Sequence, residues 1–269
     1  MFPFRNILFP TDFSPNAQAA LKYAAAFARH GHGRVVLFSV HDAKASGNLQ
    51  SQLDELASDP LLSGVDIERF VVDGEPPAKI AQGAIDHDID LITVSMRERN
   101  RLYRAFGSSM AEDIIAESPC AVLAVRPPQR DFVDPLTEIQ LKRVLLATNF
   151  RPSSVAATQL ATQIANQLGA ELHSVYVQER MGQIARSGGA THVAEGRPYQ
   201  EIVKLAETLD VDLIVIGAAV HGSLFGSGHV LGSEIERVIR NAPCPVLCVP
   251  AARVVTPLPA LVTQIVPQT

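Results

Sequence analysis

The feature that most restricts the fold of this chain is an internal repeat. Four segments of the first half return in the second: Thr11-Asp12-Phe13 as Thr148-Asn149-Phe150, Gly74-Glu75-Pro76 as Gly196-Arg197-Pro198, Ile89–Ile92 as Val211–Ile214, and Ser118-Pro119-Cys120 as Ala242-Pro243-Cys244. The matched segments lie roughly 120 to 140 residues apart, which is the length of a whole domain and far more than one unit of a solenoid. The repeat therefore predicts two copies of one domain.

Short apolar runs alternate with helical patterns in each copy. In the first copy the run Asn6–Phe9 leads to Ser14 and Pro15, which favour a helix start at that point. Leucines at helical spacing over residues 49–56 predict a second helix, and an apolar run over residues 91–94 predicts a fourth strand. Strands that alternate with helices predict a parallel sheet covered by helices on both faces.

Composition excludes several classes of protein. A net charge of −5 over 269 residues gives no basic surface for nucleic acid or an anionic membrane. The longest apolar runs fall far short of the ~20 residues of a membrane span, and the first residues lack the pattern of a signal peptide. The three cysteines fit a reducing compartment, so we expect a cytoplasmic protein. The histidines and cysteines show no metal-ligand spacing.

A glycine-rich loop in the second copy is the clearest candidate site. The apolar run Leu213–Ile216 ends at Gly217, four further glycines follow at 222, 226, 228 and 232, and a helical pattern begins directly after Ser233. This order of strand, glycine loop and helix start is typical of an anion site, because glycines admit a phosphate and the first helical N–H groups point at it. A P-loop is excluded because Ser223 stands where its lysine must be, and Gly232 comes one residue too late for a dinucleotide fingerprint.

The spacing Gly222-x9-Gly232-Ser233, with the ending Ala242–Val246, resembles the universal stress protein family. Its nucleotide-binding members carry Gly-x2-Gly-x9-Gly-Ser/Thr; here Ala219 replaces the first glycine, and Gly217 lies two residues earlier. The resemblance implies an α/β fold of two tandem Rossmann-like domains, similar to adenine nucleotide α-hydrolases. Each would be a doubly wound parallel sheet with strand order 3-2-1-4-5.

The resemblance also implies ATP in the second domain, with Mg²⁺ or Mn²⁺ held on its phosphates because no carboxylate cage is visible. The residues expected to bind the nucleotide are Ala147, Asn149, Val175, Val177, Gly217, His221, Gly222, Gly232, Ser233 and Glu234. Asn149 stands where relatives have an adenine-binding Asp, and its amide can both donate and accept. No catalytic residue is expected, and the family implies at most slow ATP hydrolysis.

Other interpretations of these residues stay open. Ser233-x-x-Glu236 also matches a capping box, and Asp12 and Asn149 also suit the turn before a helix. In the first copy the charged segment Arg97–Arg101 replaces the glycines, so we expect no nucleotide there; an arginine cluster for another anion is the alternative. A nucleotide-free scaffold with the same fold is the second hypothesis. An adenylating ligase is the third, but the phosphate loop that it needs after the first strand is absent.

We expect domains at residues 1–128 and 141–251, a linker at 129–140 and a C-terminal tail at 252–269. In the second domain, the second helix is expected to be reduced to a loop containing Gly182, Gly188 and Gly189. Single-domain relatives pair through their last strands, so we expect Ala121–Val125 beside Val246–Val249 as a pseudo-dimer within the chain, which would cover both edges. An unknown protein partner is expected, and a further homodimer stays open.

Overall fold

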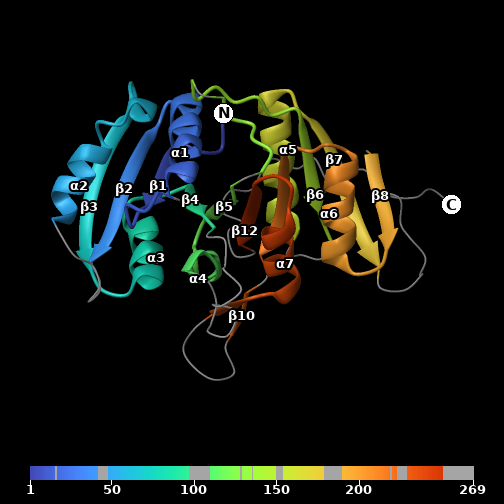
Figure 1. The fold of residues 1–269 in the computed structure, drawn as a ribbon. Helices are drawn as coiled ribbons and strands as arrows, with labels where there is room; N and C mark the ends of the chain where they lie inside the picture. Colours follow the sequence, from blue (N-terminus) through green and yellow to red (C-terminus); the bar gives the residue numbers. More distant parts are fainter. Residues whose placement is uncertain are drawn as a thin grey trace.

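The computed structural model describes residues 1–15, 17–41, 48–96, 110–127, 129–134, 136–149, 154–178, 190–218, 220–222 and 229–250. These residues form a ten-stranded sheet in the order β3-β2-β1-β4-β5-β12-β9-β6-β7-β8, and a separate hairpin of β10 and β11. Figure 1 shows the two halves side by side, with β5 and β12 at the centre of the sheet. Each half therefore has the strand order 3-2-1-4-5, and that prediction is confirmed.

The first half contains β1 (Asn6–Pro10), α1 (Gln18–Gly31), β2 (Arg34–His41), α2 (Leu49–Leu56), the 3₁₀ turn η1 (Pro60–Leu62), β3 (Asp66–Asp73), α3 (Pro76–Asp86), β4 (Leu91–Ser95), α4 (Met110–Glu117) and β5 (Ala121–Val125). The second half contains β6 (Arg143–Ala147), α5 (Val155–Leu168), β7 (Glu171–Gln178), β8 (Ala190–Glu195), α6 (Pro198–Thr208), β9 (Leu213–Ala218), β10 (Val220–Gly222), β11 (His229–Leu231), α7 (Ser233–Asn241) and β12 (Val246–Pro250).

The halves are joined by an antiparallel pair of strands. Strand β5 pairs with β12 in the register Val246 to Ala124, Leu247 to Leu123 and Cys248 to Val122, whereas the other neighbours in the large sheet run parallel. The predicted pseudo-dimer within the chain is thus confirmed. Because each last strand covers the edge of the other, neither half exposes that edge.

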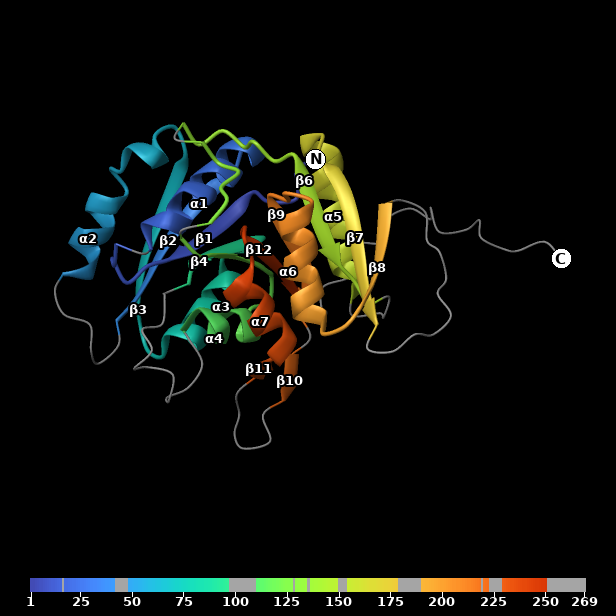
Figure 2. The same cartoon turned by 45° about the vertical axis from the view of Figure 1, so that its right-hand side comes forward.

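Helices cover both faces of the sheet (Figure 2), and the buried residues form two apolar layers, one on each face. One layer contains α1, α2 and α5, and the other contains α3, α4, α6 and α7. Alternate residues of a strand enter alternate layers, as Ile7 and Phe9 enter the first and Leu8 the second. Each layer includes residues of both halves, so the core is continuous across the β5–β12 junction.

Helix α1 begins later than its sequence suggests. The prediction of Ser14 as the N-cap is wrong, because the helix starts at Gln18 after Ala17. The N–H of Ser14 instead donates to Oδ1 of Asp12 at 3.0 Å, and its carbonyl accepts the N–H of Ala17 at 2.9 Å. Phe13 has a φ of 57°, so the chain makes a tight turn at the end of β1 before it enters the helix.

The segment between the halves is part of the core. Phe132 is 1% exposed, and its ring lies 5.0 Å from that of Tyr23 on α1, centroid to centroid. The hydroxyl of Tyr23 donates to Oδ1 of Asp131 at 2.7 Å. The segment at 129–140, expected as a linker, is therefore held firmly against the first half over its described residues.

Some expectations concern residues outside the described ranges. These are the charged segment Arg97–Arg101, the loop with Gly182, Gly188 and Gly189, and the C-terminal tail.

Candidate functional site

The candidate site lies where the strand order of the second half reverses. Strand β6 lies between β7 and β9, and its last residue, Ala147, pairs with Val175 on one side and Ile216 on the other. In doubly wound sheets the crevice beyond the carboxyl ends of such strands is the usual place for a ligand. The structure therefore brings Ala147 and Val175 together at this point.

The chain leaves β6 through a fixed turn. The N–H of Thr148 donates to the carbonyl of Val175 at 3.0 Å, and its hydroxyl donates to Oγ of Ser154 at 3.1 Å. Asn149 follows and is exposed. Val177 is half-buried and pairs with Ala194 on β8, so β7 extends beyond the end of β6. This extension places Val177 past the carboxyl end of β6, beside the point where the strand order reverses.

The glycine loop contains more regular structure than predicted. Gly217, the expected end of the apolar run, lies inside β9 and pairs with Val249, and the strand continues for one more residue to Ala218. Gly222 ends β10 and pairs with His229 on β11. Because β11 runs from His229 to Leu231, it separates Gly222 from Gly232, and the two glycines are not adjacent.

Helix α7 begins without a side-chain cap. Gly232 is its N-cap residue, with φ −61° and ψ 135°, and as a glycine it has no side chain to cap the first turn. Ser233 is the first helical residue and is exposed. The capping-box interpretation is therefore wrong, because Ser233 sits one position too late to cap the helix. The first N–H groups of such a helix have no partner within the helix and carry the positive end of its dipole.

The acidic side chains of this first turn are engaged elsewhere. The carboxylate of Glu234 accepts the N–H of Tyr199, at the start of α6, at 3.1 Å and Nη1 of Arg237 at 2.8 Å. Glu236 pairs with Nη2 of Arg240 at 2.6 Å. Sequence reasoning missed the role of Glu234, which ties α6 to α7. Because both charges are paired, their repulsion of an anion at the helix start is reduced.

Other expected groups lie outside what the structure describes. The side chains of His221 and His229 are not described; their backbones lie in the β10–β11 hairpin. Within the described ranges, no three His, Cys, Asp or Glu side chains gather in a way that would hold a metal ion.

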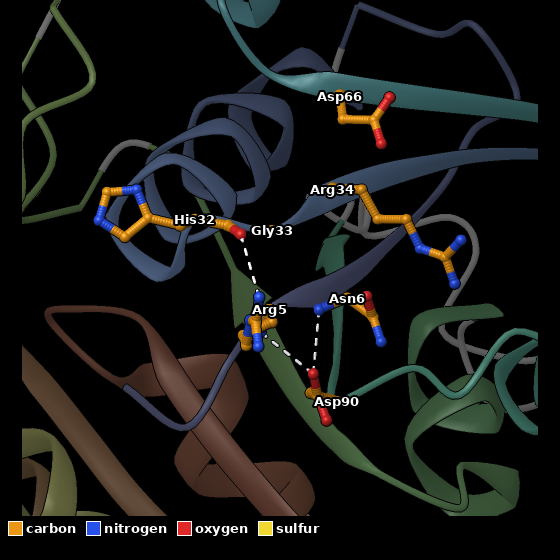
Figure 3. Close-up of a pocket in the computed structure, with 7 residues that line it drawn as sticks. All are labelled: Arg5, Asn6, His32, Gly33, Arg34, Asp66 and Asp90. Carbon is orange, nitrogen blue, oxygen red and sulfur yellow. Dashed lines mark hydrogen bonds between the residues drawn. The ribbon is translucent and has the colours of Figure 1, made fainter. Parts of the chain in front are cut away.

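A hollow lies at the amino ends of the strands of the first half. It is lined by Arg5, Asn6, His32, Gly33, Arg34, Asp66 and Asp90 (Figure 3). Its charged groups are mostly used within the fold. Arg34 pairs with Glu68 and donates to the carbonyl of His87 at 3.0 Å. Oδ2 of Asp90 accepts two backbone N–H groups at the start of β1. This hollow lies at the amino ends of the strands, so we do not assign it a ligand.

Comparison with known proteins gives a consistent result. The family model described as "Universal stress protein family" matches residues 3–126 and 187–250. A universal stress protein of Methanocaldococcus jannaschii is 30% identical over 140 residues, which are 40% of this chain and 81% of that protein. One from Methanothermobacter thermautotrophicus is 50% identical over 50 residues, which are 19% of this chain and 32% of that protein.

The fold as a whole also has a solved counterpart. The crystal structure of a universal stress protein from Archaeoglobus fulgidus superposes with a TM-score of 0.72 at 22% identity, and the match covers 91% of this chain and 96% of that one. At this identity the likeness concerns the fold alone.

No helix in the part of the chain that the structure describes is long and apolar enough to cross a bilayer.

Proposed function

Because this chain belongs to the universal stress protein family, we propose that it is a nucleotide-binding regulatory module that holds one ATP in its second half. The observation that carries the proposal is the start of α7, whose N-cap residue is a glycine without a capping side chain and which follows β9 in the chain, beside the point where the strand order reverses. The N–H groups of a helix start, with the positive end of the helix dipole, stabilise a phosphate. The exposed hydroxyl of Ser233 adds a donor.

The conformation of Gly232 supports the same proposal. Its φ of −61° is open to any residue, so the backbone does not require glycine at this point. A missing side chain there leaves room for a ligand to approach the first turn of α7. The paired carboxylates of Glu234 and Glu236 lessen the repulsion of the phosphates.

The adenine would lie against the other side of the crevice. We propose that the exposed amide of Asn149 both donates to and accepts from the edge of the base. Ala147, Val175 and Val177 would supply apolar surface and backbone groups beside it. Gly217, His221 and Gly222 would border the phosphates, and Mg²⁺ or Mn²⁺ would bind to the phosphate oxygens.

The proposed role is binding and regulation in the stress response, in the cytoplasm, through a protein partner that the bound state would recognise. No described side chain beside the start of α7 is placed as a general base for water, since the carboxylates of Glu234 and Glu236 are both ion-paired. We therefore expect at most slow hydrolysis of ATP.

The test is the nucleotide content of freshly purified protein, released by denaturation and identified by mass spectrometry. We expect about one ATP per chain, because only one half carries the glycine pattern. Gly232→Val should abolish retention without loss of folding, since valine suits the backbone angles at this position. Gly107→Val in the first half is the matched control and should leave ATP in place; equal loss from both variants would refute the assignment to the second half.

A nucleotide-free scaffold is the second candidate. It is favoured by the position of β11 between Gly222 and Gly232, which spreads the glycine motif over a hairpin. A folded protein that carries no nucleotide and shows no thermal shift with ATP and Mg²⁺ would establish this alternative.

A further inference from the structure

Helix α7, whose start is the proposed phosphate site, is fastened at its other end to the first half of the chain. Nε and Nη2 of Arg240 donate to Oε1 and Oε2 of Glu112 on α4 at 2.8 and 2.9 Å. Glu112 is 3% exposed and the Arg240 side chain 31%, so the carboxylate is shielded from water while the guanidinium is partly accessible. Figures 1 and 2 both show α4 and α7 next to each other below the centre of the sheet.

The residues after α7 are held in the same way. Nη2 of Arg126, directly after β5, donates to the carbonyl of Ala242 at 3.0 Å. The N–H of Arg130 donates to the carbonyl of Pro243 at 2.8 Å. These bonds take up backbone acceptors at the end of the helix, so α7 cannot slide along its axis without breaking them.

The strand before α7 also rests on the first half. Strand β11 contacts α4, and its last residue, Leu231, is 7% exposed and belongs to the same apolar layer as Ile114. Gly232 therefore connects β11, which lies against α4, to α7, whose Arg240 is paired with Glu112 on α4. The start of α7 thus lies between β11, which rests on the first half, and α6 of its own half, to which Glu234 ties it.

The ion pair is not repeated by the pseudo-symmetry. Alignment of Ser118-Pro119-Cys120 with Ala242-Pro243-Cys244 places Ala116 opposite Arg240 and Glu112 opposite Glu236. Arg240 contacts both glutamates, Glu112 across the junction and Glu236 within its own helix. Ala116 has no charged group that could pair with Glu236 or Glu112, so the first half has no counterpart of this ion pair.

We propose that Glu112 is a positioning residue for the nucleotide site of the second half and acts through Arg240; the proposal rests on the proposed function. The ion pair lies about 10 Å along α7 from Ser233. A helix moves as a rigid rod over that distance, so a shift at Arg240 moves the N–H groups at the other end. Hydrogen bonds to phosphate weaken steeply with such misalignment.

The experiment compares Glu112→Gln with Glu236→Gln in the full chain, with ATP and adenosine as probes in calorimetric titrations. Gln keeps the shape of Glu112 but removes the charge that strengthens both bonds to Arg240. We expect Glu112→Gln to weaken ATP binding about tenfold and to leave adenosine binding within about twofold, because adenosine does not reach α7. Glu236→Gln removes the other partner of Arg240 and should not weaken ATP binding.

A third variant keeps the test valid if Glu112→Gln does not fold. Arg240→Lys preserves the charge but cannot make the two-pronged contact, and it should reduce ATP affinity by a smaller factor. Equal ATP affinity in folded wild type, Glu112→Gln and Arg240→Lys would overturn the positioning role. So would equal losses for ATP and adenosine, which would indicate general loosening. Wild-type protein that binds no ATP would overturn the proposed function itself.

Discussion

Asp90 and Asp212 make the same pair of hydrogen bonds in the two halves. Oδ2 of Asp90 accepts the N–H groups of Arg5 and Asn6 at 3.1 and 2.9 Å. Oδ2 of Asp212 accepts those of the residues at 142 and 143 at 2.8 and 2.9 Å. Each carboxylate thus holds the start of the first strand of its half beside the start of the fourth. The recurrence marks a structural clamp, and it explains the aspartate that the repeated segments Ile89–Ile92 and Val211–Ile214 share.

Loss of this clamp should lower stability. Asp212→Ala leaves two backbone N–H groups without their acceptor, and we expect the free energy of unfolding to fall by about 1–2 kcal/mol. Asp86→Ala is the control, because the Asp86 side chain is an exposed one on α3 that only accepts from Gln82 at 2.7 Å. Urea denaturation of both variants measures the difference. If Asp212→Ala and Asp86→Ala unfolded at the same urea concentration, the role of Asp212 as a clamp would be contradicted.

Two residues of the segment between the halves should contribute very differently to the free energy of unfolding. Phe132 is 1% exposed, whereas Leu136 is 79% exposed. Phe132→Ala should reduce the free energy of unfolding by about 3–5 kcal/mol, because it empties the space beside Tyr23 and Phe27. Leu136→Ala should change it by less than about 0.5 kcal/mol. Thermal denaturation would distinguish them, and similar small effects would show that the segment is a loose tether.

Alkaline pH should destabilise the fold through its buried thiols. Burial raises the pKa of Cys244 to about 12 and that of Cys248 to about 12. In the unfolded chain a thiol titrates near pH 8.5. Between these values the unfolded state releases protons that the folded state keeps, so stability is fully present below about pH 8.5 and falls as pH rises toward 12.

Urea denaturation at several pH values would measure this decline. Burial also raises the pKa of Tyr23, which acts in the same direction above pH 10. Cys248→Ala should make the decline between pH 9 and 12 shallower, whatever its effect at pH 7. If stability fell as steeply with pH in this variant as in the wild type, or if the native thiols were labelled rapidly at pH 8, the conclusion that these thiols are buried would be contradicted.

Much of the fold could be predicted from the sequence because the repeat and the alternation of apolar segments reflect burial directly. The pairing of β5 with β12 followed from the behaviour of single-domain relatives. The start of α1 could not be predicted, because Ser14 and Pro15 have the chemistry of a helix start. The structure shows that Ser14 instead takes part in a turn with Asp12 and Phe13, which lies before the helix.

The candidate site was harder to predict. The hairpin of β10 and β11 depends on backbone hydrogen bonds, which leave no side-chain pattern, so its glycines read as one open loop. Glu112 and Arg240 lie 128 residues apart, and no local motif links them. The available signal was a carboxylate on the apolar face of α4, beside Ala111 and Ile115, because a buried charge requires a partner.

The antiparallel junction of β5 and β12 has a consequence for how this protein can change. In a homodimer every substitution occurs twice, and the association weakens on dilution. Here the two halves share one chain, so each faces the other at a fixed, high effective concentration. One half can also change alone, as Arg240 opposite Ala116 illustrates. The fusion therefore permits one half to specialise in binding while the other specialises in support.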